Sequence, residues 1–397
     1  MVPPISTAPR ALLGLRVVDF SAMMAGPTCA RWLADMGAEV IKIEPVEGDH
    51  MRTRPPLRGG RSSFYGHMNA GKRSVALNLK HARAVELARD LCIGADVVIE
   101  AFRPGVMARL GLGAAALHAL NPRLVYCSIS GYGQANSASS RPAYAAAVHA
   151  ASGYYTTLGE YQDGLDRPPN SGIPLADMLT AIYAAMAIQT ALLERERGLP
   201  GRTIDVNLMD SILSVLALEL QTAQFPQPGR RPLYKPLKTR DGFVIVVSVN
   251  ENNFKGVCAC TGHPEWLEDP LLNSDRGRLQ NWDLYMGCIE SWTEQRSSEE
   301  CERLMSEAGV PCSRYRRVGD ALTDPQFVER GSLATVEDAA GAFRVTNLPF
   351  AFDGAKPKVG ARVAELGEDT ADVLQSLLGV GADEVDRLRA AGVIAGP

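Results

Sequence analysis

The sequence lacks the short motifs that mark the commonest nucleotide-dependent and metal-dependent enzymes. No GxGxxG follows the first predicted strand, where "SAMMAGP" offers one glycine, and there is no GxxxxGK[ST], HExxH or GxSxG. These absences argue against dinucleotide-dependent dehydrogenases, P-loop enzymes, zinc peptidases and α/β-hydrolases. The six histidines are scattered without the spacing of metal ligands, so no metal site is predicted.

Strong net charge, paired cysteines and long apolar runs are also missing. A formal net charge of -4 on 397 residues gives no broad attraction to nucleic acid or to an anionic membrane. The apolar runs are shorter than a membrane span, and the N-terminal "MVPPISTAPRALLGL" lacks the apolar core of a signal peptide. None of the eight cysteines forms a CxxC pair, which is typical of reduced thiols. We therefore expect a cytoplasmic protein with no nucleic-acid or membrane partner.

The patterns that are present indicate an α/β protein. Hydrophobic residues make up 46% of the chain and charged residues 22%, which is typical of a globular protein, and the length suggests two or three domains. Residues 15–21 and 38–44 are short β-branched runs on either side of a helical stretch, which predicts a βαβ unit. The alternation continues to about residue 135, so we expect a doubly wound sheet with helices on both faces. Ligands would lie where its strands end, at residues 21–26, 102–105 and 130–133.

The remainder of the chain divides at a proline-rich segment. Helical patterns dominate from about residue 145 to 220, and residues 224–242 then combine four prolines with many charges, as a linker does. A smaller unit with one strand and several helices continues to about residue 325. The last seventy residues contain two more helices.

Asp177 stands at the start of the most apolar helical run, "LADMLTAIYAAMAIQTALLERERG". The run reads as a buried helix, and one of its faces carries Leu179, Ile182, Tyr183, Met186, Thr190 and Leu193. An N-cap or first-turn acid, favoured by the helix dipole, explains Asp177 without any chemistry. A helix N-terminus also keeps a carboxylate ionised and therefore nucleophilic. Spacing alone does not separate these two interpretations.

Several cationic residues, a histidine and a tyrosine are further candidates for a functional site. Lys72, Arg73 and Lys80 flank one predicted strand, and Arg103 and Arg109 follow another. Cations at strand ends suit the phosphate groups of a bulky ligand, although solvated surface charges give the same pattern.

In "RPAYAAAVHAASG", His149 is either a hydrogen-bonded packing residue or a base, and Tyr144 either packs at a rim or contacts a ligand.

Six segments, in order, resemble the class III CoA-transferase family, also called the CaiB/BaiF group. They are "DFSAMMAGPTCARWLADMGAEVIKIEPVEGDHMR", "NAGKRSVALNLK", "VIEAFRPGVMARLGL", "NPRLVYCSISGYGQ", "LADMLTAIYAAMAIQTALLERERGLPGRTIDVNLMDSIL" and "LGEDTADVLQSLLG". The family includes formyl-CoA transferase, carnitine CoA-transferase and, as a sister branch, the 2-methylacyl-CoA racemases. The resemblance covers nearly the whole chain and weakens around residues 225–300.

The resemblance implies a Rossmann-like large domain built from both chain ends, residues 1–222 and 328–397, and a smaller α+β domain, residues 223–327, inserted between them. It also implies an interlocked homodimer, coenzyme A and acyl-CoA as substrates with no permanently bound cofactor, and Asp177 as the catalytic residue. The positions that line coenzyme A in the family are Met24, Ala25, Leu77, Lys80, Phe102, Arg103, Arg109 and Tyr144.

The sequence departs from formyl-CoA transferase at places that matter. Met24 replaces a glutamine, Pro45 an arginine and Pro142 a lysine, and residues 224–242 lack the GGGG run of the family's flap. These departures argue against formyl-CoA and oxalate as substrates. The basic stretches at 230–240 and 314–317 would suit a dicarboxylic acid such as succinate, unless they are ordinary surface charge.

CoA transfer is the function that the resemblance favours, and a 2-methylacyl-CoA racemase that abstracts an α-proton is the alternative. The racemases pair the aspartate with a histidine where this chain has Tyr144, and a phenol with an ordinary pKa near 10 is a poor base. In the transferase reaction Asp177 would pass through a mixed anhydride and an aspartyl-CoA thioester, with water excluded. Backbone N–H groups at the helix N-terminus would hold the developing oxyanions.

Overall fold

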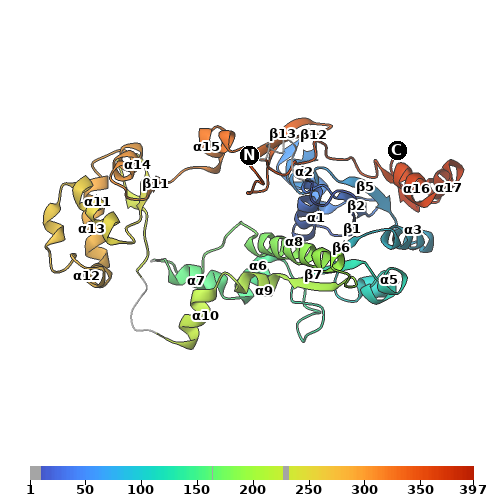
Figure 1. The fold of residues 1–397 in the computed structure, drawn as a ribbon, viewed down its shortest axis with the longest axis horizontal. Coiled ribbons are helices and arrows are strands. Elements are labelled where there is room, and N and C mark those ends of the chain that lie inside the picture. The colour runs from blue at the N-terminus through green and yellow to red at the C-terminus, as the bar shows by residue number, and fades with distance from the viewer. Residues whose placement is uncertain (1–9, 163, 227–231) are drawn as a thin grey trace. The chain divides into compact units, whose positions relative to one another are not determined.

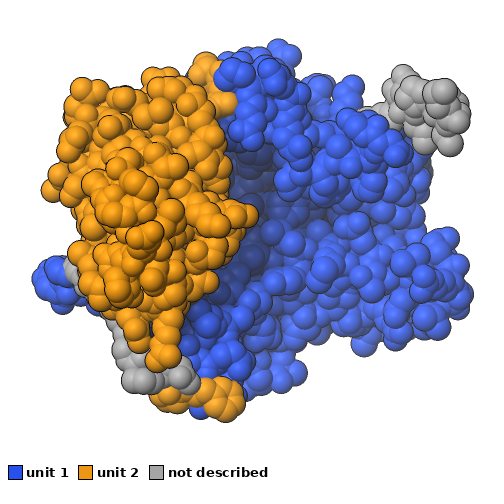
Figure 2. All heavy atoms as spheres, turned by 60° about the vertical axis from the view of Figure 1, so that its left-hand side comes forward, with its two compact units in different colours: residues 1–224, 325–397 blue, residues 225–324 orange. Residues whose placement is uncertain are grey.

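The computed structural model describes residues 10–162, 164–226 and 232–397. The chain forms two compact units, one of Met1–Gln224 with Pro325–Pro397 and one of Phe225–Asp324 (Figure 2). The divisions fall two and three residues from the boundaries expected from the sequence, at 222 and 327. The large unit therefore contains both ends of the chain, and each unit is described below by itself.

The large unit is built on a seven-stranded sheet in the order β14-β5-β2-β1-β6-β7-β8 (Figure 1). The strands are β1 (Arg16–Asp19), β2 (Glu39–Glu44), β5 (Arg73–Leu77), β6 (Val97–Glu100), β7 (Val125–Ser130), β8 (Thr203–Asn207) and β14 (Ile394–Ala395). All pairs are parallel except β14 with β5. Counted along the chain, the parallel strands lie in the order 3-2-1-4-5-6, which is the Rossmann order. This confirms the predicted α/β class.

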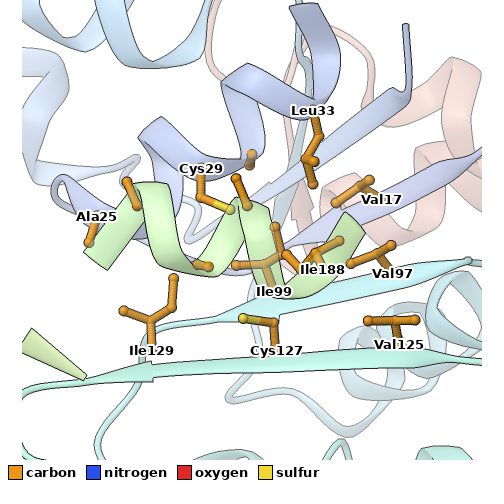
Figure 3. Close-up of a cluster of buried hydrophobic side chains, with 14 of the residues drawn as sticks. Val17, Ala25, Cys29, Leu33, Val97, Ile99, Val125, Cys127, Ile129 and Ile188 are labelled. Atoms are coloured by element: carbon orange, nitrogen blue, oxygen red, sulfur yellow. The ribbon is translucent and has the colours of Figure 1, made fainter. Parts of the chain in front are cut away.

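Side chains alternate between two cores on opposite faces of this sheet. Val17 and Val97 face one core, where helices α1 (Ala25–Asp35) and α8 (Leu175–Glu196) pack, as Figure 3 shows. Their sequence neighbours Val18 and Val98 face the other core. That second core is covered by α3 (Ala82–Ile93), α16 (Thr370–Leu378) and α17 (Ala382–Ala390). The sheet is therefore buried on both faces, as its continuous apolar strands predict.

Helix α8 buries a face rich in alanine and exposes an apolar stripe on another face. Ala181, Ala184 and Ile188 are fully buried against α1 and the sheet, because alanines allow helices to approach closely. Ile182 and Met186, on the face singled out from the sequence, are 49% and 57% exposed. The interpretation of α8 as a buried helix is therefore correct for its alanine face and wrong for this apolar stripe.

Helix α8 also corrects the expectation that no apolar run is long enough for a membrane span. Its 22 residues pass that test by length and composition, although 44% of the apolar window is buried. Its packing between α1 and strands of the sheet is that of a core helix.

The remaining elements of the large unit are short. They are the 3-10 helix η1 (His50–Thr53), the hairpin β3 (Leu57–Arg58) and β4 (Arg61–Ser62), α2 (Ser63–Asn69), α4 (Val106–Arg109), α5 (Ala114–Leu120), α6 (Ala145–Ala151), α7 (Tyr154–Glu160), α9 (Leu208–Leu213), α10 (Ala217–Gln224), α15 (Pro325–Glu329) and the hairpin β12 (Leu333–Asp338) and β13 (Gly341–Thr346).

The small unit has its own antiparallel sheet, in the order β11-β10-β9, and its own core. Its elements are β9 (Leu237–Lys238), β10 (Phe243–Val246), α11 (Glu251–Thr261), the 3-10 helix η2 (Pro264–Leu267), α12 (Asp275–Gln280), α13 (Trp282–Thr293), α14 (Ser298–Glu307), β11 (Cys312–Arg314) and the 3-10 helix η3 (Val318–Leu322). All eight cysteines of the chain are free thiols, five of them buried. A cytoplasmic location stays a prediction.

Candidate active site

The order of the parallel strands reverses between β1 and β6, so the ligand crevice of this fold lies at the carboxyl ends of these two strands. The turn from β1 to α1 carries Met24 and Ala25, and the turn after β6 carries Phe102 and Arg103. Four residues predicted to line coenzyme A therefore belong to the two turns that border the crevice.

Buried charges fix the turn after β1. The Lys72 ammonium lies 2.8 Å from an Asp19 carboxylate oxygen and donates to the Pro27 carbonyl at 2.8 Å. Lys42 donates to the Ser21 carbonyl at 2.8 Å. Burial opposes the charge on Asp19, but Lys72 and Lys42 hold its pKa below the usual value, while burial lowers the pKa of Lys72 to about 8. Lys72 is therefore a structural cation, and its prediction as a phosphate ligand is wrong.

The backbone of this turn restricts which residues fit at positions 23 and 26. A side chain at Gly26 would place its Cβ 2.2 Å from the Cβ of Ser21, and Met23 adopts the left-handed conformation with φ 67°, which costs of order 1–3 kcal/mol. Helix α1 then begins at Met24 without a side-chain cap. Its first backbone N–H groups are therefore directed to the crevice, where an anion is favoured.

Arg73 is also committed to the protein itself. It lies at the beginning of β5, where its guanidinium pairs with Glu39 at 2.9 Å and with Asp372. Its prediction as a phosphate ligand is therefore wrong as well.

Three other predicted cations are exposed at the carboxyl edge. Lys80 follows β5, Arg103 follows β6, and Arg109 ends α4. Within the described ranges, no ion pair or side-chain hydrogen bond holds any of the three. Strands β5 and β6 are separated by β2 and β1, or about 14 Å at ordinary strand spacing. An elongated ligand with several phosphates fits such a row of cations.

Two of the predicted positions expose little or no surface. Leu77 is fully buried in the core that α3 and α16 cover, and Ala25 is 5% exposed in the first turn of α1. Near Phe102 the geometry is set by Glu100, whose carboxylate accepts the Phe102 N–H at 2.9 Å. Burial raises the pKa of Glu100.

Tyr144 and the turn after β1 line the same pocket. Tyr144 is 69% exposed and lines a cavity of about 750 Å³ with Met23, Phe64, His50 and Arg54, among others. This volume is within the ordinary range for a small-molecule site. Neither His50 nor Arg54 was singled out from the sequence. The signal available was their place in "GDHMRTRPP", directly after a strand end.

Asp177 is the third residue of α8, and the N-cap is Pro174. In the described part of the chain its carboxylate has no cationic partner, and the one local group that favours its charge is its own backbone N–H. Burial dominates and raises the pKa of Asp177 from 3.8 to about 6. The pKa is therefore shifted against ionisation, because desolvation outweighs the backbone hydrogen bond that favours the charged form. At pH 7 a group with this pKa is still about nine-tenths ionised.

His149 caps α8 in place of Asp177. Its Nε2 accepts the backbone N–H of Ala176 at 3.0 Å, and its Nδ1 lies 3.2 Å from the Tyr155 hydroxyl, which donates to the Ser171 carbonyl at 3.2 Å. The side chain is 1% exposed, and burial lowers its pKa. The interpretation of His149 as a hydrogen-bonded packing residue is confirmed.

The remaining N–H groups at this end of α8 are also occupied. Leu175 donates to the Ile173 carbonyl at 2.9 Å, Ala176 to His149, and Asp177 interacts with its own carboxylate. The role of backbone N–H groups at or near this helix end in holding an oxyanion stays a prediction.

The two basic stretches that would suit a second carboxylate are in part paired within the protein and in part undescribed. Arg314 pairs with Glu302 at 3.2 Å, and Arg316 pairs with Asp324. Residues 230 and 231 lie outside the described residues. Arg314 and Arg316 are therefore surface cations that are already paired with carboxylates. No group of three or more possible metal ligands occurs among the described residues.

Residues 12–370 match CoA-transferase family III, and the chain belongs to this family. It is 30% identical to succinyl-CoA–D-citramalate CoA-transferase of Chloroflexus aurantiacus, over 97% of this chain and 98% of the relative. It is 29% identical to human succinyl-CoA:glutarate CoA-transferase, over 96% and 90%. A solved CaiB/BaiF family protein of Brucella suis matches with a TM-score of 0.80 at 30% identity, covering 94% of this chain and all of that one. The protein is thus an enzyme of the class III CoA-transferase type.

Proposed function

We propose that the enzyme moves coenzyme A from an acyl-CoA donor to a free carboxylic acid, with Asp177 as the nucleophile. The observation that carries this proposal is the state of Asp177: a poorly solvated carboxylate at the mouth of an apolar helix, with no cationic partner among the described residues, while His149 caps the preceding N–H group of Ala176. A carboxylate in such an environment is poorly stabilised by water and is therefore a better nucleophile.

The reaction needs four acyl transfers and no proton transfer. An Asp177 oxygen attacks the donor thioester carbonyl, and the C–S bond breaks. CoA departs as the thiolate, and the acyl group remains on Asp177 as a mixed anhydride. The thiolate attacks the aspartyl carbonyl of the anhydride, which releases the donor acid as its carboxylate and leaves an aspartyl-CoA thioester. The acceptor carboxylate attacks this thioester and expels the thiolate, which then takes the new acyl group and frees Asp177. Because each intermediate is hydrolysable, the site must exclude water.

Coenzyme A would lie along the carboxyl edge of the sheet. The unpaired cations Lys80, Arg103 and Arg109 would meet its phosphates, and the main chain around Ala25 and Leu77 would border the ligand. Met24, Phe102 and Tyr144 supply partly or fully exposed side chains. Tyr144 would orient the acyl group.

The racemase alternative finds less support. Both ring nitrogens of His149 are engaged and its side chain is buried, so it is not available to take a proton from a substrate. Tyr144 stands where the racemases have their histidine, and a phenol is a poor base at neutral pH.

We propose a dicarboxylic acid as one of the two acids. Arg54 and His50 line the same pocket as Tyr144, and in the described structure Arg54 has no carboxylate partner. A guanidinium pairs well with a distal carboxylate. The relatives named for succinyl-CoA and glutarate fit this chemistry. We expect Arg54→Gln to raise KM for succinate or glutarate about tenfold and to leave KM for a monocarboxylic acid unchanged.

We also propose the interlocked homodimer that the resemblance implies. The outer face of α8 supports it, because Ile182, Met186 and Leu193 are about half exposed. This stripe borders an apolar groove of about 650 Å³ that includes Phe350. A second copy of the chain would remove this surface from water.

The test of the transferase proposal is exchange followed by trapping. The protein is incubated with succinyl-CoA and a panel of free acids, and products are identified by mass spectrometry. Borohydride or hydroxylamine is then expected to modify Asp177. Undiminished exchange by Asp177→Ala would refute the proposal, and solvent deuterium entering the α-carbon of a branched acyl-CoA without any acid would favour the racemase.

A further inference from the structure

The start of α8 is capped by a residue that is distant in the sequence. Short polar side chains at the N-cap ordinarily accept the first free N–H groups of a helix, and first-turn acids help. Here the N-cap is Pro174, which has no side-chain acceptor. The acceptor comes instead from His149, 27 residues earlier in the chain. The nearest acid, Asp177, takes no part in capping Ala176.

The hydrogen bonds around His149 are consistent with one tautomer. Because Nε2 accepts the Ala176 N–H, it carries no proton, and Nδ1 then carries the proton and donates it to the Tyr155 oxygen. The Tyr155 hydroxyl is left to donate to the Ser171 carbonyl. Every donor in the chain Ala176, His149, Tyr155, Ser171 therefore meets an acceptor. The rings of His149 and Tyr155 lie edge to face at 5.3 Å, which further fixes the imidazole.

The hydrogen bond between His149 and Ala176 also connects α6, which begins next to Tyr144, to the start of α8, which carries Asp177. His149 is the fifth residue of α6, whose N-cap is Tyr144, so the two residues are about 7 Å apart along the helix. Through its imidazole, α6 holds the residue that directly precedes Asp177. This hydrogen bond, together with the packing of Val148 against the same core as α8, therefore helps to fix the relative position of Tyr144 and Asp177.

We propose that His149 is a positioning residue that caps α8 so that the Asp177 carboxylate stays free to attack the thioester. Without an acceptor at position 149, the Ala176 N–H would be left unsatisfied in a buried site, which is costly. The Asp177 side chain is the polar acceptor best placed to turn back and satisfy it, as first-turn acids commonly do. An oxygen held in this way has its lone pairs directed at the helix instead of at the substrate. This inference rests on the proposed function.

The test compares two substitutions of similar size. His149→Phe removes the acceptor and keeps the ring, whereas His149→Gln offers an amide oxygen to the Ala176 N–H. We expect His149→Phe to lower kcat by about 10- to 100-fold, with KM for the acyl-CoA within about threefold, because the loss affects the nucleophile and not the binding of coenzyme A. His149→Gln should recover most of kcat. Trapping of the acyl group on Asp177 in a single turnover should slow in the same order.

Three outcomes overturn the proposal: full activity in His149→Phe, equal impairment of both variants, or a rise in KM with kcat unchanged. Should His149→Phe fail to fold, Tyr155→Phe removes the hydrogen-bond partner of Nδ1, and it is expected to lower kcat by a smaller factor with KM unchanged; an unaltered kcat there would also overturn the proposal. If the wild-type enzyme transfers coenzyme A to none of the acids tested, the proposed function itself is refuted. If the wild type and His149→Phe are both fully active, only the role of His149 is refuted.

Discussion

At the scale of single residues, the ionised Asp177 that the proposed reaction needs has a cost in stability. Its pKa is raised from 3.8 to about 6 by burial, so the folded protein holds a proton there more tightly than the unfolded chain. Stability from this group is complete below about pH 4 and is lost as the pH rises through about 6. The ionised form needed for attack is therefore the less stable form.

The first prediction concerns Asp177→Asn. We expect acyl exchange to fall by at least about a thousandfold, because the amide is no nucleophile. We expect the free energy of unfolding at pH 7.5 to rise by about 1–3 kcal/mol, because a poorly solvated charge is removed. Denaturant titration at pH 7.5 and pH 4 measures both states, and the gain should vanish at pH 4. A variant less stable than wild type at pH 7.5 would contradict this account of the pKa.

The second prediction concerns the acid side of the pH profile. Because the carboxylate must be ionised to attack, kcat/KM should fall about tenfold per pH unit below about pH 6. The cause is the raised pKa of Asp177. Initial rates from pH 4.5 to 8.5 with a donor thioester that is stable over this range provide the measurement. A profile that stays flat down to pH 4.5 would mean that the carboxylate is better solvated than the structure indicates.

At the scale of elements, the turn from β1 to α1 depends on a buried ion pair. Asp19 and Lys72 are 0% and 5% exposed, and Lys72 also holds the Pro27 carbonyl. Removing one partner leaves the other charge buried alone. This is why a lysine that looks like a phosphate ligand in the sequence is part of the scaffold instead.

The third prediction separates this scaffold lysine from a binding lysine. Lys72→Met should lower the free energy of unfolding by about 3–5 kcal/mol, measured by thermal or chemical unfolding. The matched control, Lys80→Met, should leave stability within about 0.5 kcal/mol and raise KM for the acyl-CoA about tenfold. Equal effects of the two variants on stability would contradict the assignment.

At the scale of the whole molecule, the outer face of α8 is an apolar surface that the single chain does not cover. The stripe of Ile182, Met186 and Leu193 remains about half exposed, although the helix is long and largely apolar. A surface of this kind is expected to be covered in the assembled enzyme.

The fourth prediction concerns assembly. Wild-type protein at micromolar concentration should have the mass of a dimer by light scattering, and Met186→Glu should shift it toward the monomer, because the new carboxylate would be buried without a partner. Leu57→Glu serves as the control, since Leu57 is also 50% exposed but lies in the β3–β4 hairpin. A monomeric wild type, or a dimer unaffected by Met186→Glu, would refute the proposed homodimer.

Much of this architecture was accessible from local sequence pattern. The strand ends that carry Met24 and Arg103 were predictable because short β-branched runs alternate with amphipathic helices. Strand β14 was not, because two residues have no periodicity to read and their pairing with β5 is decided at long range. The exposed stripe of α8 was misjudged because periodicity shows that a helix has faces but not which face meets the core when both are apolar.

The sequence by itself determined the α/β class, the edge at which ligands are expected and the candidate acid, since these depend on local propensity and on residues in fixed order. Only the tertiary structure decided which side chains are free to act. Lys72 and Lys80 are alike as residues, and His149 and Asp177 are both plausible caps or catalysts in the chain. Burial and partners distant in sequence turned one lysine into scaffold, made the histidine the cap and left the aspartate free, because charge, hydrogen-bond occupancy and solvation are properties of the folded surroundings.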